Sequence, residues 1–302
     1  MLLSKGVLKW FKLSRDPFTG ELKSGKDVFS PHSCTIVELR IWKAVDEQQM
    51  AALVGDVGSG KSTIMAKVLE EMGRNKLYRI VHVYSLGRRK LTASQLCDAL
   101  IADLVGLSVY NGLDQKARMI VEAFEDIEKR GQKVLLVIDE AHELPTQLLK
   151  DLKKLHEIRG KFSAPLAIVL VGQTRLRRRL QREVALKECL DRTEMIEVPG
   201  FQDRRDGNME EARGYLEYKF HKAGGRKVDE VFADDGLAML LAHPAARYPL
   251  GINNLASVAM DLATRIQERR VSADVMAMAF VEIGYDGQAV EGEEEPAEAE
   301  VV

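Results

Sequence analysis

The sequence is poor in three features. Cysteine is rare, with Cys34, Cys97 and Cys189 far apart in a chain of 302 residues, and no CxxC pair is present to hold a metal or a redox disulfide. No apolar run reaches the roughly 20 residues that a membrane helix needs, and the chain does not open with the apolar segment of a signal peptide. Neither sign of charge dominates, with 44 basic and 46 acidic side chains, so a nucleic-acid surface would have to be a local patch. We therefore expect a cytoplasmic protein without a membrane partner.

The sequence does contain short apolar runs that alternate with helical patterns. This alternation is typical of an α/β fold, a parallel sheet with helices on its faces. We expect helices between the strands, and Thr92 with Gln95 three residues later is a capping box that opens one of them. The five expected strands cover residues 51–54, 79–84, 134–138, 166–171 and 194–198.

Composition divides the chain into four segments. Residues 1–45 have no clear periodicity, and we expect an irregular lead-in packed on the core of residues 46–200. Strands stop after Pro199 and Gly200, and residues 201–285 are expected to form a helical lid domain. Residues 286–302 are rich in Glu, Gly, Pro and Ala and too poor in apolar side chains to order themselves, so we expect a disordered acidic tail.

A glycine-rich loop between the first strand and the next helix matches the phosphate-binding pattern G-x-x-x-x-G-K-[ST]. Glycines let the backbone N–H groups surround phosphates, and the helix N-terminus favours their negative charge. We expect Lys61 to neutralise the β- and γ-phosphates of ATP and the Ser62 hydroxyl to bind Mg²⁺. The residues expected to contact the nucleotide are Gly55, Asp56, Val57, Gly58, Ser59, Gly60, Lys61, Ser62 and Thr63.

Two carboxylates follow the apolar strand of residues 134–138. This is the Walker B pattern: Asp139 is expected to hold Mg²⁺ and Glu140 to deprotonate the attacking water. The run Asp139-Glu140-Ala141-His142 also matches the box of a helicase class, but such helicases need a second motor domain, and only about a hundred residues follow Phe201. His142 is interpreted as a polar neighbour of the site, outside the catalytic set.

Three further predictions concern polar residues at the ends of strands. Gln173 follows the fourth strand and would sense the γ-phosphate, unless it is an ordinary strand-end amide. Arg192 precedes the fifth strand and would point at a neighbouring subunit as an arginine finger, unless it is a solvated charge. The basic run Arg88, Arg89 and Lys90 follows the second strand and would contact DNA phosphates, unless its charges only keep an exposed loop soluble.

Five segments together resemble the ExeA-type AAA+ ATPases, a group that includes the DNA transposition helpers TnsC, TniB and the B protein of bacteriophage Mu. The similarity covers roughly residues 5 to 270. The segments are Trp10 to Phe18, the loop GDVGSGKST, the strand LLVIDEAHEL, the strand LVGQTRLRRRL and the helix start GINNLA.

The resemblance implies an AAA+ P-loop core with a five-stranded parallel sheet, a C-terminal helical lid and self-assembly into rings or helical filaments with ATP between subunits. In the group, an arginine before the last core strand acts in trans, which corresponds to Arg192. The group's lid helix usually begins with Pro-Arg, whereas here Leu250 follows Pro249, so the lid sensor is missing or replaced, with Arg247 as the nearby candidate.

The resemblance leaves two classes of function open. A transposition helper is an ATPase that coats double-stranded DNA without sequence preference and recruits a transposase, which suits this chain length. The secretion protein ExeA carries a membrane segment and a wall-binding domain after its ATPase, and neither is found in this sequence. The alternative is therefore a secretion-type or other AAA+ adaptor ATPase that does not bind DNA.

Overall fold

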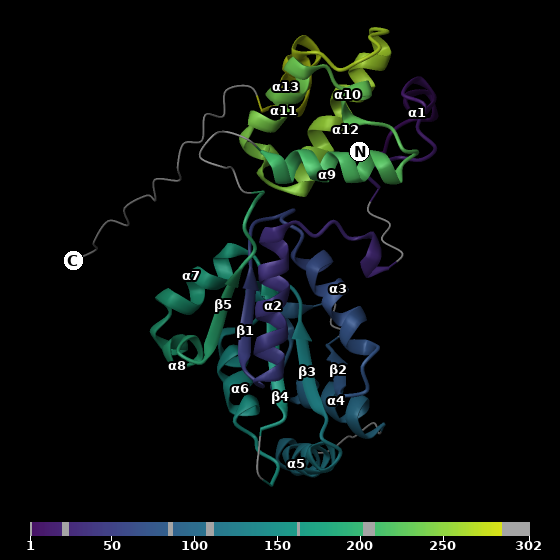
Figure 1. Cartoon of the computed structure of the whole chain (residues 1–302). Helices are drawn as coiled ribbons and strands as arrows, with labels where there is room; N and C mark the ends of the chain where they lie inside the picture. Colours follow the sequence, from purple (N-terminus) through teal and green to yellow (C-terminus); the bar gives the residue numbers. More distant parts are fainter. Residues whose placement is uncertain are drawn as a thin grey trace, which may run out of the picture. The chain divides into compact units, whose positions relative to one another are not determined.

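The computed structural model describes residues 2–19, 24–83, 87–106, 112–161, 164–201 and 209–285. Within these ranges the chain forms two compact units (Figure 1). One unit comprises residues 21–200 and holds the sheet, and the other combines residues 1–20 with the chain from residue 201 onward. The predicted acidic tail, residues 286–302, lies outside the described residues. None of the described helices combines the length and the apolar character needed to cross a membrane.

The first unit contains a five-stranded, all-parallel sheet in the order β2-β3-β4-β1-β5. All five strands lie within two residues of the positions expected from sequence, and the three central ones are apolar runs. The parallel order brings the carboxyl ends of β1, β3 and β4 to one edge of the sheet. The strands are β1 (Met50–Val54), β2 (Tyr78–His82), β3 (Lys133–Ile138), β4 (Leu166–Gly172) and β5 (Thr193–Glu197).

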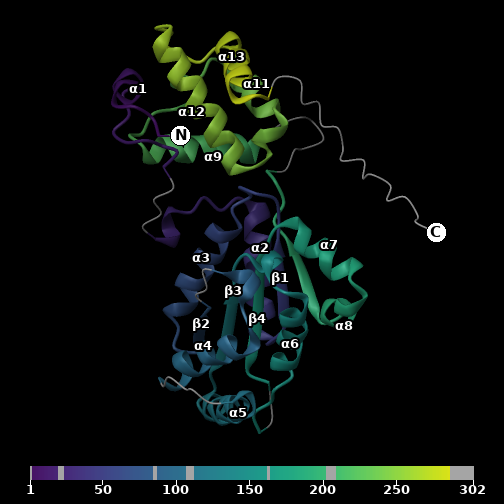
Figure 2. The same cartoon turned by 180° about the vertical axis from the view of Figure 1, so that it is seen from behind.

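The side chains of alternate residues in the central strands pack into two separate hydrophobic cores, one on each face of the sheet. In β1, Ala51 and Leu53 join the core under α2 (His32–Asp46) and α3 (Lys61–Gly73). Met50, Ala52 and Val54 join the core under α4 (Ala93–Val105), α5 (Leu113–Lys129) and α6 (Thr146–His156). The period of two follows from the pleat of a strand. In Figure 1 α2 lies in front of the sheet, and the turned view of Figure 2 brings the opposite face forward.

Three helices of this unit, α2, α7 and α8, had not been assigned in the sequence analysis. The capping box on Thr92 is confirmed, because its hydroxyl accepts from the backbone N–H of Gln95 (3.3 Å) and the Gln95 side chain accepts from the N–H of Thr92 (3.0 Å). The α-helices are α2 (His32–Asp46), α3 (Lys61–Gly73), α4 (Ala93–Val105), α5 (Leu113–Lys129), α6 (Thr146–His156), α7 (Thr174–Arg182) and α8 (Lys187–Leu190). Short 3-10 turns are η1 (Gly25–Asp27), η2 (Arg88–Lys90), η3 (Ala141–Glu143) and η4 (Val184–Leu186).

Helices α2 and α3 are joined by a largely buried ion pair. Lys67 Nζ lies 2.7 Å from Glu38 Oε2, with side chains only 17% and 11% exposed, and it also donates to Ser30 Oγ at 2.8 Å. The ammonium, the carboxylate and the hydroxyl thus supply one another's charge and hydrogen-bond partners at a place where water has little access. The pair therefore fixes how α2 lies beside the helix that begins at the glycine-rich loop.

Replacing Glu38 with alanine is expected to lower the free energy of unfolding by about 3 kcal/mol, because the ammonium of Lys67 would stay buried without its carboxylate. Glu47→Ala is the matched control, since Glu47 pairs with Lys43 on the outside of the same helix at 3.9 Å. An exposed pair of this kind contributes about 0.5 kcal/mol or less. Urea denaturation of the two variants measures the difference, and equal midpoints would refute a structural role for the pair.

The described part of the second unit is helical, as expected for residues 201–285, apart from one isolated β-bridge between Phe232 and Val271. Gly251 in α12 lets this helix approach η5 closely, since a Cβ atom at Gly251 would lie 1.8 Å from the carbonyl oxygen of Ala245. The elements are α1 (Lys5–Trp10), α9 (Glu210–Lys222), α10 (Val228–Val231), α11 (Asp234–Ala242), η5 (Pro244–Arg247), α12 (Pro249–Arg265) and α13 (Ala273–Ile283).

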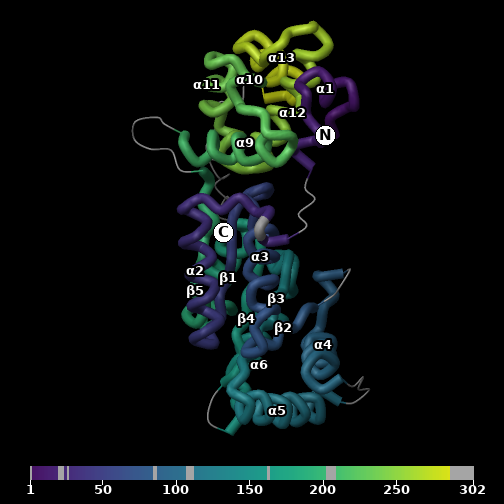
Figure 3. Tube along the Cα trace, turned by 45° about the vertical axis from the view of Figure 1, so that its right-hand side comes forward, coloured from purple at the N-terminus to yellow at the C-terminus, as the bar shows by residue number. Residues whose placement is uncertain are grey.

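The lead-in does not form one irregular segment on the core, and our expectation for residues 1–45 needs correction. Residues 32–46 form helix α2 on the sheet, whereas residues 1–20 belong to the helical unit, where α1 contacts α12 (Figure 3). Phe18 packs edge-on against Phe220 with 5.8 Å between ring centroids, and the indole N–H of Trp10 donates to the Glu268 carbonyl at 2.8 Å. These apolar and polar contacts stabilise the first residues against helices far along the chain.

Candidate nucleotide site

The glycine-rich loop leaves β1 and ends at α3, as its pattern requires. Gly58 and Gly60 adopt positive φ angles of 78° and 91°, a conformation that residues with a Cβ rarely adopt. Gly60 is the N-cap of α3, so the unpaired backbone N–H groups of the first helical turn, including those of Ser62 and Thr63, point toward the loop. Val57 lies at the outer tip, 66% exposed. The arrangement suits a phosphate bound at a helix N-terminus.

Lys61 lies against the inside of this loop. Its Nζ donates to the carbonyl oxygens of Gly55 (2.9 Å) and Asp56 (2.7 Å), and the residue is only 9% exposed. Burial lowers the pKa of Lys61, and the negative charges of Glu140, Asp56 and Asp139 oppose that shift. The structure thus brings the loop lysine and the two predicted carboxylates into one electrostatic environment.

Asp139 and Glu140 follow β3 directly. Glu140 adopts the left-handed conformation (φ 55°), which is uncommon for a residue with a side chain, and its backbone N–H donates to Asp139 Oδ1 at 2.7 Å. The Glu140 carboxylate is 55% exposed, so a water molecule can reach it. Ser62 and Asp139 line one cavity of about 230 Å³ beside α3.

The donor set fits magnesium held together with a nucleotide. Within the described residues, no group of three or more His, Cys, Asp or Glu side chains is placed to hold a metal ion by itself. Mg²⁺ characteristically uses one or two protein oxygens and completes its shell with phosphate oxygens and water. Ser62 and Asp139, as hard oxygen donors on the same cavity, match that requirement.

Gln173 and its neighbour Thr174 follow β4, next to the end of β3. The backbone N–H of Gln173 donates to Nδ1 of His142 at 3.2 Å, so the predicted sensor lies against the turn that follows Glu140. The hydroxyl of Thr174 donates to Asp56 Oδ1 at 2.7 Å, which ties the start of α7 to the phosphate loop. Thr174 is the polar neighbour to which the sequence analysis preferred Gln173 as the sensor.

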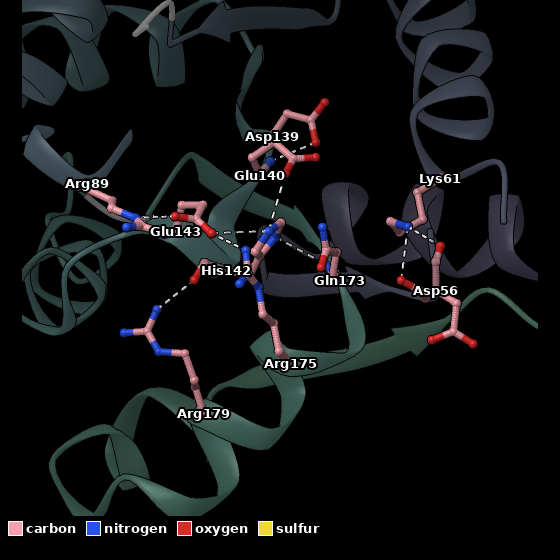
Figure 4. A network of polar contacts seen from close by, with 11 residues as sticks. Asp56, Lys61, Arg89, Asp139, Glu140, His142, Glu143, Gln173, Arg175 and Arg179 are labelled. Atoms are coloured by element: carbon pink, nitrogen blue, oxygen red, sulfur yellow. Dashed lines mark hydrogen bonds and ion pairs between the residues drawn. The ribbon is translucent and has the colours of Figure 1, made fainter. Parts of the chain in front are cut away.

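A polar network surrounds the turn after Glu140 (Figure 4). His142 Nε2 lies 3.3 Å from Glu140 Oε2 and 3.7 Å from Glu143 Oε1. Glu143 also forms ion pairs with Arg89 and Arg175. Burial, and next the charge of Arg175, lower the pKa of His142, whereas the charges of Glu140 and Glu143 oppose that shift. The sequence analysis left His142 outside the catalytic set and overlooked Glu143 and Arg175.

The basic run Arg88-Arg89-Lys90 forms the turn η2, and its three side chains have different surroundings. Arg89 and Lys90 are exposed, whereas Arg88 is partly buried, donates to the carbonyl oxygen of Val83 (2.8 Å) and lines the cavity beside Ser62 and Asp139. Two of the three predicted DNA contacts are therefore accessible to a large partner, and Arg88 faces the nucleotide side.

Arg192 is not part of the site formed by its own chain. It precedes β5, whose first residue pairs with the first residue of β1, so the length of a strand, about 13 Å, separates it from the edge that carries the phosphate loop. Its guanidinium pairs with Glu157 Oε1 at 2.8 Å and is 49% exposed. A catalytic role for Arg192 therefore requires a second subunit.

Arg247, the candidate for the lid sensor, lies in the helical unit. Its guanidinium carbon is 5.6 Å from the centroid of the Tyr248 ring, and its carbonyl oxygen accepts from the backbone N–H of Phe201 at 2.8 Å. Arg247 therefore has partners of its own in this unit, and its sensor role stays a prediction.

Residues 45–180 match a family described as AAA domain. That segment contains the phosphate loop, Asp139, Glu140 and Gln173. The sheet order and the helical C-terminal unit agree with this match. The chain has the AAA+ P-loop ATPase fold.

Solved structures with the same AAA+ fold have little sequence identity with this chain. Cdc6p from Pyrobaculum aerophilum is 16% identical with a TM-score of 0.60, over 88% of this chain and 70% of that one. The Aeropyrum pernix ORC1 protein in complex with DNA is 21% identical with a TM-score of 0.53, over 85% and 66%. Drosophila ORC bound to DNA is 14% identical with a TM-score of 0.63, over 93% and 66%.

This chain spans about two thirds of the length of the DNA-bound structures. At these identities the similarity shows the fold alone. No curated protein matches the sequence. The expected membership of the transposition-helper group is therefore a proposal that rests on the sequence motifs.

Proposed function

We propose that this protein is an ATPase that binds double-stranded DNA in an ATP-dependent, sequence-independent way, and that it regulates DNA transposition by assembling on target DNA and recruiting a transposase. One observation carries the link between ATP and DNA. Arg89 of the exposed basic turn is bound to Glu143, three residues after Glu140, so a phosphate-contacting surface would adjoin the nucleotide site.

The residues of the site suit hydrolysis of ATP. Phosphate oxygens are better acceptors than the loop carbonyls that Lys61 contacts, so its ammonium would transfer to the β- and γ-phosphates. Ser62 and Asp139 would hold magnesium, which neutralises charge on the phosphates when bound. The exposed Glu140 carboxylate would orient a water molecule and accept its proton. Gln173, beside the turn that carries Glu140, would contact the γ-phosphate.

The DNA part of the proposal depends on the exposed surface of η2. Arg89 and Lys90 offer positive charge without base-reading geometry, which fits binding to phosphates rather than to a sequence. Two proteins of similar fold carry DNA in their solved structures, which makes DNA the first ligand to test here. A transposase as partner follows only from the resemblance of the motifs, and the alternative is an adaptor ATPase that does not bind DNA.

The double variant Arg89→Ala/Lys90→Ala should flatten the salt dependence of DNA binding. Each phosphate contact adds about 0.9 to the slope of log affinity against log salt, so the slope should fall by about 1.8. Affinity should fall alike for every duplex sequence. Fluorescence anisotropy with two unrelated duplexes, at several salt concentrations, measures both effects.

Arg88→Ala is the matched control, because Arg88 belongs to the same turn but faces the cavity, so it should leave the slope nearly unchanged. Removing residues 286–302 should tighten binding at low salt, since the acidic tail competes for the basic surface. An unchanged slope in the double variant would assign the DNA contact to a different basic segment.

A further inference from the structure

His142 lies between two carboxylates. Its Nδ1 accepts the backbone N–H of Gln173 at 3.2 Å, so the neutral ring carries its proton on Nε2. The Nε2 atom lies 3.3 Å from Glu140 Oε2 and 3.7 Å from Glu143 Oε1. One N–H donates well to only one acceptor at a time, and the shorter distance is to Glu140.

Glu143 connects this buried histidine to the surface. Its carboxylate binds the guanidinium groups of Arg89 and Arg175, whose side chains are 79% and 48% exposed, while the His142 side chain is 1% exposed. Arg89, Glu143, His142 and Glu140 thus form a continuous path from the basic turn η2 to the candidate general base (Figure 4).

The backbone of this path is held rigidly. Arg179 Nη1 donates to the carbonyl oxygens of His142 and Leu144, both at 2.9 Å, and its Nε donates to Glu183 at 2.9 Å. Gln173 holds the ring of His142 from the other side. If Glu143 exchanged partners, the side chains of Glu140 and Glu143 would therefore move, while the backbone of the turn would stay in place.

We propose that His142 is a positioning residue for Glu140 and that Arg89, acting through Glu143, determines which carboxylate His142 holds. With Arg89 bound, Glu143 accepts from two guanidinium groups, and His142 would donate to Glu140, which holds that carboxylate out of the orientation in which it deprotonates the attacking water. When a DNA phosphate binds Arg89, Glu143 loses one donor and accepts from His142 instead. Glu140 is then free to take a proton from water. The proposal rests on the proposed function and adds the route by which DNA stimulates hydrolysis.

The decisive variant is Arg89→Ala, assayed without DNA. Removing Arg89 should imitate DNA, so the basal kcat for ATP should rise about tenfold, the ratio expected for one hydrogen bond to a charged group, and DNA should add little further. Arg130→Ala is the control for loss of an exposed arginine, because Arg130 lies at the end of α5 and belongs to neither the nucleotide site nor the basic turn η2. Its basal kcat should equal that of the unmodified protein. Equal basal rates in the two variants would overturn the proposal.

A second pair of variants tests His142 itself. His142→Leu removes the donor and should give the same kcat with and without DNA, with an unchanged KM for ATP. His142→Gln restores an N–H donor and should restore part of the DNA dependence, which a purely structural role would not produce. If His142→Leu kept its full DNA stimulation, His142 would not be the positioning residue.

DNA affinity is measured separately, so that the two proposals fail differently. If the unmodified protein binds DNA but Arg89→Ala has an unchanged basal rate, the route through Glu143 is wrong and the proposed function still stands. Failure of the intact protein to bind DNA would overturn the proposed function, and with it the DNA trigger, whatever the basal rates.

Discussion

Replacing Glu140 with glutamine is expected to slow ATP turnover at least about a hundredfold while leaving the binding of ATP and magnesium intact. Glutamine keeps the size and polarity of the side chain but cannot accept a proton from water, and loss of a general base typically has this effect. Steady-state phosphate release gives the rate, and fluorescence of a labelled ATP analogue gives the affinity. Lys61→Ala should instead abolish nucleotide binding, because Lys61 is the ammonium group inside the loop.

Glu71→Gln is the control for this pair, since Glu71 is an exposed carboxylate on α3, the helix that begins with Lys61. It should leave both rate and affinity unchanged. Normal hydrolysis by the Glu140→Gln protein would remove Glu140 from the role of general base. Normal ATP affinity in Lys61→Ala would show that the nucleotide is held elsewhere.

Arg192→Ala is expected to reduce turnover by about a thousandfold, the usual contribution of an arginine finger, although Arg192 is about a strand length from the site of its own chain. The reason is that the guanidinium of Arg192 would enter the nucleotide site of a neighbouring subunit and stabilise the transferring phosphate there. Turnover of the unmodified protein should accordingly rise more steeply than in proportion to its concentration, and further with DNA. A monomeric sample that hydrolyses ATP at the full rate would contradict a composite site.

Mixing two inactive proteins tests the same idea without reference to absolute rates. Lys61→Ala subunits cannot bind ATP but retain Arg192, and Arg192→Ala subunits bind ATP but lack the finger, so mixed assemblies should regain activity. Arg159→Ala, an exposed arginine two residues from Glu157, the partner of Arg192, should be active alone. If mixing restored no activity, Arg192 would have only the structural role of pairing with Glu157.

The sequence predicted those strands and site residues whose signal lies within a short stretch of the chain. The three central strands were found because each is a short apolar run, and the site was found because the loop and the two carboxylates follow two of these strands directly. Helix α2 was missed because its pattern is inverted at several positions: Glu38 is buried with Lys67, while Ile36 and Leu39 are 46% and 63% exposed. A helix with a polar residue inside and apolar residues outside has a weak periodic signal.

The remaining differences come from contacts between distant parts of the chain. Phe18 meets Phe220 across about two hundred residues, and no local pattern assigns the first residues to the helical unit. Helix α7 was missed because only Leu176 and Leu180 are buried among its many arginines. Arg89 and Glu143 are 54 residues apart in sequence, so only the folded chain shows that the basic turn lies beside the catalytic edge.

Binding of duplex DNA in the presence of ATP, of ADP and of no nucleotide is the most direct test of the proposed function. An electrophoretic mobility shift, run with the intact chain and with Glu140→Gln to prevent hydrolysis, should show tight binding with ATP, with similar affinity for unrelated sequences, and weak binding with ADP or without nucleotide. Absence of binding in every nucleotide state, with ATP hydrolysis intact, would contradict the DNA-binding account and favour an adaptor ATPase.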